Sequence, residues 1–94
     1  MPQNTTVNVP AGAWTQLTDA DIITITFQNI GGHFILVKGT TDTTPPADSA
    51  GALRYNPGQG ERNVAMADLF PGLSGGDRLW AYSDSNVSVM VSHA

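Results

Sequence analysis

The sequence predicts an all-β protein that forms a single small antiparallel β-sandwich, or a barrel-like sandwich, of six to seven short strands over residues 1–94. Two observations carry this prediction. Short segments in which apolar residues occupy every second position recur roughly every ten residues along the chain. Turn-forming clusters of Gly, Pro, Asn and Asp stand between them, and no segment keeps a helical period. A chain of this length fits one domain.

The clearest alternation lies in residues 87–92, where three valines point to one face of a strand and two serines and a methionine point to the other. Residues 78–82 predict the preceding strand, and the polar residues 83–86 predict the turn of a β-hairpin between the two. One face of this hairpin must line the core, and an aromatic pair suits that position, so we expect Trp80 and Tyr82 there. The second strand ends beside Ala94, so we expect this end of the chain to be held in the fold.

Three strands are predicted in the first third of the chain, at residues 5–9, 13–17 and 22–29. The first alternates only weakly and is expected at a sheet edge. The third is rich in β-branched side chains, which favour a half-buried pleated surface. Its alternation predicts that Ile23, Ile25 and Phe27 share the buried face.

The middle of the chain begins with a predicted tight hairpin turn at residues 29–32, because glycine adopts the positive φ angles that such a turn requires. Residues 33–39 predict its partner strand. They are apolar on both faces, so this strand is expected inside a sheet or covered on both sides.

The next segments are shorter and more polar. Residues 40–49 predict a loop, because adjacent prolines cannot join a central ladder. Residues 52–55 predict a short strand, and residues 61–66 predict another. Residues 65–70 are also compatible with one helical turn before Pro71.

Composition excludes several function classes. Charged residues make up 13% of the chain, about half of the usual share, and the formal net charge is −4. The four fixed cations are scattered along the sequence, so we expect no nucleic-acid binding, which needs a basic stripe. There are no cysteines and therefore no disulfides or thiolate metal sites. Neither a signal peptide nor an apolar run long enough to span a membrane is present, so we expect cytosolic synthesis and no membrane insertion.

No constellation of residues predicts catalysis, a cofactor or a metal. His33 and His93 stand in no recognisable motif, and no nucleophile elbow exists. Asp19 and Asp21 lack the glycine-punctuated acidic pattern of a calcium loop. The glycine clusters are not followed by a helix with a phosphate-binding lysine. An aromatic platform for sugars stays open as an alternative, built from Trp14, Tyr55, Trp80 and Tyr82.

Six short motifs together resemble a known group of proteins. They are FQNIGG at 27–32, VKGT at 37–40, TPPA at 44–47, LFPG at 69–72, LWAYS at 79–83 and VSVMVSH at 87–93. In this order they resemble the small β-sandwich structural proteins of tailed bacteriophages, which occur as head decoration or cement proteins, head-spike bases and tail accessory modules. The resemblance covers nearly the whole chain, and no catalytic residues come with the family.

The resemblance implies a non-enzymatic virion protein, a capsid cement or decoration module assembled in the host cytoplasm. Its implied partners are the major capsid protein and copies of itself, which makes it a homo-oligomer on the particle. A small chain with few charges is also typical of a protein whose surface is largely covered by its partners in the assembled state. A tail, baseplate or head-spike module and a carbohydrate-binding β-sandwich are the alternatives. A small enzyme on a β-barrel is a further class, but no convergent polar face supports it.

Partner contact is expected at the loops formed by residues 40–49 and 56–63. Prolines there limit the entropy that the chain loses on docking. The short termini leave no arm for threading through a lattice, so attachment is expected to come from the body of the fold or its loops. The residues expected to contact the partner are Thr43, Thr44, Pro45, Pro46, Asn56 and Pro57.

Overall fold

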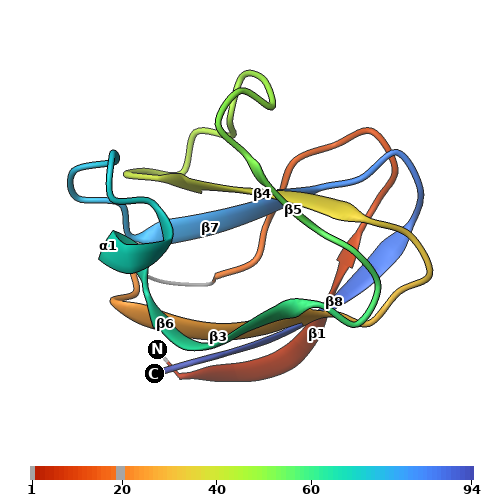
Figure 1. The fold of residues 1–94 in the computed structure, drawn as a ribbon, viewed down its shortest axis with the longest axis horizontal. Coiled ribbons are helices and arrows are strands. Elements are labelled where there is room, and N and C mark those ends of the chain that lie inside the picture. Colours follow the sequence, from red (N-terminus) through yellow and green to blue (C-terminus); the bar gives the residue numbers. More distant parts are fainter. Residues whose placement is uncertain (1, 19–20) are drawn as a thin grey trace.

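The computed structural model describes residues 2–18 and 21–94, which form two four-stranded antiparallel sheets packed face to face (Figure 1). The predicted all-β sandwich is confirmed, with eight strands in the described part instead of six to seven. The elements are β1 (Gln3–Val9), β2 (Thr15–Gln16), β3 (Thr24–Asn29), β4 (Ile35–Thr40), β5 (Leu53–Tyr55), β6 (Gly60–Ala65), α1 (Met66–Leu69), β7 (Arg78–Tyr82) and β8 (Val87–His93).

The strand order is that of a jelly roll. One sheet has the order β1-β8-β3-β6 and the other β2-β7-β4-β5. The antiparallel pairs β1–β8, β2–β7, β3–β6 and β4–β5 are those of one long hairpin folded at its middle. The remaining pairs, β3–β8 and β4–β7, form when that hairpin rolls up into two sheets. This is the eight-stranded, double-sheet arrangement known as a jelly roll.

Both predicted hairpins are wrong, because the strands on either side of each turn belong to different sheets. β7 lies in one sheet and β8 in the other, and the same holds for β3 and β4. Residues 30–34 therefore cross between the sheets, and neither Gly31 nor Gly32 has a positive φ. A Cβ on Gly31 would lie 2.7 Å from the Val87 Cγ1 atom, so glycine is needed there for close packing.

The core lies between the sheets and contains the predicted alternating residues of β3 and β8. Ile25 and Phe27 are buried, and so are all three valines of β8. The Phe27 ring meets the Tyr55 ring edge-on, with 5.0 Å between their centroids. β4 is an interior strand, as expected, with Ile35 and Val37 fully buried.

The prediction for Ile23 is wrong, because β3 begins at Thr24, two residues later than predicted. Ile22 is buried instead, and Ile23 is 84% exposed. The Ile22 amide donates a hydrogen bond to the Asp77 carbonyl, and the Ile23 carbonyl accepts one from the Met66 amide. These contacts hold a bend at Ile23, and the alternation of the strand starts only after it.

The predicted inward face of β7 is also wrong. Leu79 and Ala81 are fully buried in the core, so Trp80 and Tyr82 lie on the outer face of the sheet. Trp80 is nevertheless buried there, and its indole Nε1 donates to the Thr40 Oγ1 atom at 2.7 Å. On this strand the smaller side chains of Leu79 and Ala81 face the core, while the Trp80 indole obtains a hydrogen-bond partner outside it.

Candidate functional site

One end of the sandwich is closed by α1 and residues 70–77. The strand β6 runs directly into α1, and the Phe70 and Leu73 amides close the next turns on the carbonyls of Met66 and Phe70. The side chains of these three residues meet over Gly39, where an added Cβ would lie 3.1–3.2 Å from each of them. Glycine at this point of β4 therefore allows the segment to pack against the sheet.

This end exposes apolar surface in the described part of the chain. Ile23 and Leu53 are two of the three large hydrophobic residues that the structure exposes most, at 84% and 37%. Two hollows of about 380 and 290 Å³ lie beside them and share Leu73. We call this surface the α1 end; its apolar residues are Ile23, Leu53, Ala67, Leu69, Phe70, Pro71 and Leu73.

Charged pairs stand around the α1 end. The Arg78 guanidinium pairs with the Asp21 carboxylate, and the Lys38 ammonium lies 3.5 Å from the Asp48 carboxylate. An apolar patch with a polar rim is typical of an interaction surface. The α1 end is therefore the candidate functional site of this protein.

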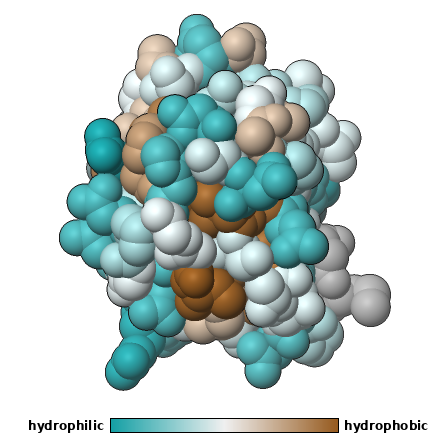
Figure 2. Space-filling model, turned by 90° about the vertical axis from the view of Figure 1, so that its right-hand side faces the viewer, coloured by the Kyte–Doolittle hydropathy of each residue, from teal (hydrophilic) through white to brown (hydrophobic). Residues whose placement is uncertain are grey.

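The opposite end of the sandwich carries the connections between β1 and β2, β3 and β4, and β7 and β8 (Figure 1). Figure 2 shows this end, where a brown patch is enclosed by teal and white surface. Ile30, in the β3–β4 connection, is 50% exposed. His33 pairs with Asp84, and the Arg54 guanidinium lies 4.0 Å from the centre of the Phe34 ring. Polar and cationic groups therefore lie beside exposed apolar surface at this end as well.

The two histidines do not form a joint site. His33 lies beside Asp84 at the start of the β7–β8 connection, whereas His93 ends β8 and contacts the Gln3 side chain. A seven-residue strand spans about 20 Å, which separates the two rings. Within residues 2–18 and 21–94, no group of three or more His, Cys, Asp or Glu residues is placed to hold a metal ion. Asp19, considered as a calcium ligand, lies outside the described residues.

The predicted contact loops flank β5 and do not form one surface. Thr43, Thr44 and Pro45 are exposed and Pro46 is half-buried, in a loop that turns back over the outer face of the β2-β7-β4-β5 sheet (Figure 1). Asn56 and Pro57 are exposed in a tight turn on the other side of β5.

That second loop is shorter than predicted. Residues 60–63 belong to β6, and only residues 56–59 form the turn. The Gly58 amide donates to the Asn29 carbonyl, and the Asn29 amide donates to the Gln59 carbonyl. These two bonds tie the turn to the end of β3.

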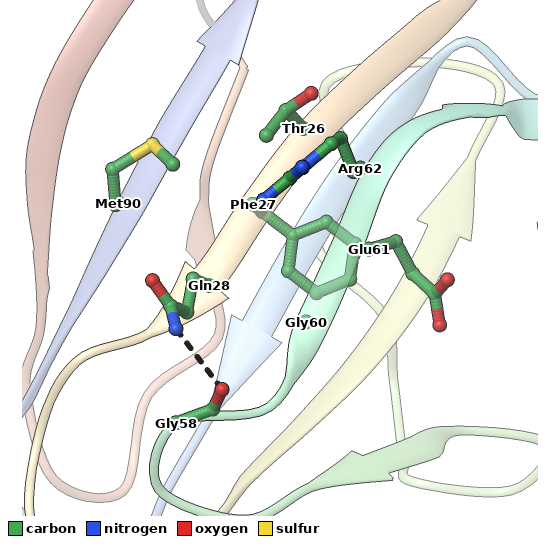
Figure 3. A pocket seen from close by; sticks show the side chains of 8 residues that line it. All are labelled: Thr26, Phe27, Gln28, Gly58, Gly60, Glu61, Arg62 and Met90. Atoms are coloured by element: carbon green, nitrogen blue, oxygen red, sulfur yellow. Dashed lines mark hydrogen bonds between the residues drawn. The ribbon is translucent and has the colours of Figure 1, made fainter.

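The outer face of the β1-β8-β3-β6 sheet holds a small polar pocket of about 200 Å³ (Figure 3). Thr26, Gln28 and Met90 line it, and the Gln28 amide donates to the Gly58 carbonyl at 3.0 Å. Arg62 supplies the cation beside it. The other charged residue that lines it is Glu61, whose carboxylate accepts a hydrogen bond from the Tyr55 hydroxyl, and the Thr26 Oγ1 atom accepts one from the Asn63 amide.

A third hollow, of about 440 Å³, lies on the outer face of the other sheet. The Trp14 and Tyr82 rings stand there 5.4 Å apart at 43°, both half-buried. Leu36 and Asp48 also line it. Trp80 does not join this platform, because it is buried against Thr40.

Comparisons with protein-family models, curated proteins and solved structures gave no match. In the described part of the chain, no helix is long and apolar enough to cross a membrane.

The α1 end was not predicted from the sequence. Its signal is the dense apolar run at residues 69–73, LFPGL, which cannot form a strand because of Pro71 and Gly72.

Proposed function

We propose that this chain is a non-enzymatic structural protein of a virion, a cement or decoration module that binds the shell of the major capsid protein. Copies of itself are its other partner, and assembly takes place in the host cytoplasm. The observation that carries the proposal is the α1 end, an apolar surface on a small domain with few charges. The resemblance of its sequence motifs to those of small phage sandwich proteins supports the same role.

Ile23 is the most exposed large hydrophobic residue in the described part of the chain. A side chain that is 84% exposed gains little from folding, but burying it in an interface contributes about 1.5–3 kcal/mol. The two hollows beside it accept side chains from a partner. Such a contact is weak when made once, and it becomes strong when neighbouring copies on a shell add avidity.

The fold supports the capsid role only by analogy. The jelly roll is common among viral capsid proteins, but lectin domains share it, so the fold alone does not assign the function. The loop of Thr43, Thr44, Pro45 and Pro46 and the turn of Asn56 and Pro57 are proposed as additional contacts, since five of these six residues are exposed.

Copy number tests the proposal. Purified particles should contain on the order of tens to hundreds of copies, measured by gel densitometry against the major capsid protein. A handful of copies would move the chain to a tail, baseplate or head spike. Absence from purified particles would overturn the structural role.

A pair of matched variants tests the surface. Ile23→Asp should abolish binding of the purified chain to particles that lack it, because the change places a charge in the apolar contact. Ile30→Asp, at the opposite end, should bind as wild type does. Both residues are exposed, so the melting temperature of either variant should stay near that of wild type. Equal binding by both variants would exclude the α1 end as the contact.

Carbohydrate binding is the second candidate, and the Trp14–Tyr82 hollow favours it. Aromatic faces stack on sugar rings, and the Asp48 carboxylate offers an acceptor for hydroxyl groups. A glycan array with wild type and Trp14→Ala tests this candidate. Binding that is lost in the variant would support it, and no binding by wild type would exclude it.

A further inference from the structure

The sandwich has four edge strands, and three of them are protected against pairing with other chains. β2 has two residues and β5 has three, and β5 also carries Arg54. β6 contains Glu61 and Arg62, shifts its register against β3, and has a positive φ of 47° at Asn63. Short length, charge and bulges are the usual devices by which proteins keep sheet edges from pairing.

β1 lacks all three devices. It has seven residues, pairs with β8 without a register shift, and contains no charged residue or proline. Pro2 and Pro10 stand outside it and only set its length. Within the described residues, the backbone of residues 4–9 is paired with β8 alone, and Asn4, Thr5 and Thr6 are exposed. This edge therefore offers free donors and acceptors to another strand.

We propose that β1 pairs with β1 of a second copy of this chain, so that two β1-β8-β3-β6 sheets join into one continuous eight-stranded sheet. The two strands run antiparallel about a twofold axis at Thr6. This register places Asn4 opposite Asn8, Thr5 opposite Val7, and Thr6 opposite its own counterpart.

The register matches the faces of the sheet. Thr5 and Val7 face the same side as the valines of β8, to which they are paired, and Asn4, Thr6 and Asn8 face outward. Because the alternation is strict, only registers that keep these faces aligned are allowed. Threonine opposite threonine and asparagine opposite asparagine can exchange side-chain hydrogen bonds, which favour a cross-strand pair.

Electrostatics favours a second copy as the occupant. Residues 2–18 contain no charged side chain, so the net charge of −4 is carried elsewhere in the chain. The outer face next to β1 is also uncharged, with Ser88, Met90 and Ser92 of β8 beside it. Two copies therefore meet without like charges at the junction. Each copy has one such edge, so pairing closes at a dimer.

This inference deepens the copy-to-copy contact proposed above by naming its strand, but it rests only on β1 and its neighbours. The test uses purified chain without particles. The dimer can therefore be absent although the chain binds capsids, and the dimer can form although the chain does not bind capsids.

Sedimentation of the wild-type chain from micromolar to millimolar concentration should show a reversible monomer–dimer equilibrium and no larger species. Thr6→Lys and Thr6→Glu should each raise the dimer dissociation constant about fivefold or more, because like charges then face each other across the axis. An equimolar mixture of the two variants should dimerise again, since lysine then faces glutamate.

Thr24→Lys and Thr24→Glu are the matched controls. Thr24 is on the same sheet, two strands away from β1, and should leave dimerisation unchanged. A wild-type chain that stays monomeric at millimolar concentration would overturn the proposal, and so would a Thr6→Lys variant that dimerises like wild type. Failure of the charge-swapped mixture to recover would also overturn it.

Amide hydrogen exchange gives a second readout. Exchange in residues 4–8 should slow as concentration rises, whereas exchange in β6 should not change. Slowing at β6, or at the α1 end instead of β1, would show that another surface joins the copies.

Discussion

At the scale of single residues, Ile25 and Val89 set the buried faces of neighbouring strands. They are 1% and 0% exposed, and their sequence neighbours Thr24 and Ser88 point outward. Ile25→Ala and Val89→Ala should each lower the free energy of unfolding by about 2–4 kcal/mol. Thr24→Ala and Ser88→Ala should have mild effects. Urea unfolding of the four variants measures this, and the opposite ranking would contradict the assigned faces.

Tyr55 makes stability depend on pH at the alkaline end. Burial, and then the hydrogen bond and the charge of Glu61, raise the pKa of the Tyr55 hydroxyl, which lies 3.1 Å from the Glu61 carboxylate. In the unfolded chain the Tyr55 hydroxyl ionises at about pH 10, whereas in the folded chain it stays protonated at that pH. The contribution of Tyr55 to the free energy of unfolding is therefore fully present below about pH 10 and is lost as the pH rises further. Tyr55→Phe should flatten this alkaline loss. Unchanged pH dependence in the variant would assign the loss to another group.

Residue-scale predictions from the sequence failed where tertiary contacts override the pattern. Asn29 was predicted as the end of a strand and the start of a turn, yet it is fully buried. Its side-chain nitrogen donates to the carbonyls of His33 and Tyr55, and its oxygen accepts from the Gly31 amide. The amide group thus joins two segments of the chain, residues 29–33 and the end of β5. No periodicity reports such a contact, because it depends on residues brought together only by folding.

At the scale of elements, Gly60 determines how closely β6 approaches β3. A Cβ at this position would lie 2.0 Å from the Phe27 carbonyl oxygen and 2.7 Å from the Gln28 Cα atom. Both are backbone atoms that cannot move independently, so Gly60→Ala should destabilise the protein by about 3 kcal/mol or more. Gly72→Ala, which meets nothing within 4 Å, is the control. Equal melting temperatures for the two variants would show that β6 moves away at little cost.

Strand positions were largely predictable, but strand partners were not. Alternation identified β1, β3 and β8, because a strand that is buried on one face carries an apolar residue at every second position. A run that is apolar on both faces identified β4. Alternation contains no information on which strand lies alongside, so the sequence predicts hairpins after β3 and β7, where the chain in fact crosses between the sheets. The α1 end was missed for a related reason, since its apolar residues belong to no regular period.

At the scale of the whole molecule, strand pairs join distant parts of the sequence. β1 pairs with β8 from Gln3↔His93 to Val9↔Val87, and even β4 and β5, which are consecutive, are separated by a twelve-residue connection, residues 41–52. Few local contacts can form first, so refolding should be slow, in the range of milliseconds to seconds. Stopped-flow fluorescence of Trp14 and Trp80 after dilution from urea measures this rate. Completion within microseconds would contradict a folding barrier set by this topology.

The place of β8 between β1 and β3 has a consequence for biosynthesis. During translation, residues 1–86 leave the ribosome before the strand that joins these two exists as a free segment. Until then the nascent chain can form only the β2-β7-β4-β5 sheet and a separate β3–β6 pair, and the edges of β1 and β3 that pair with β8 stay open. Because β1 and β3 are joined only through β8, this sheet cannot close until residues 87–93 have left the exit tunnel, however early the rest of the chain emerges.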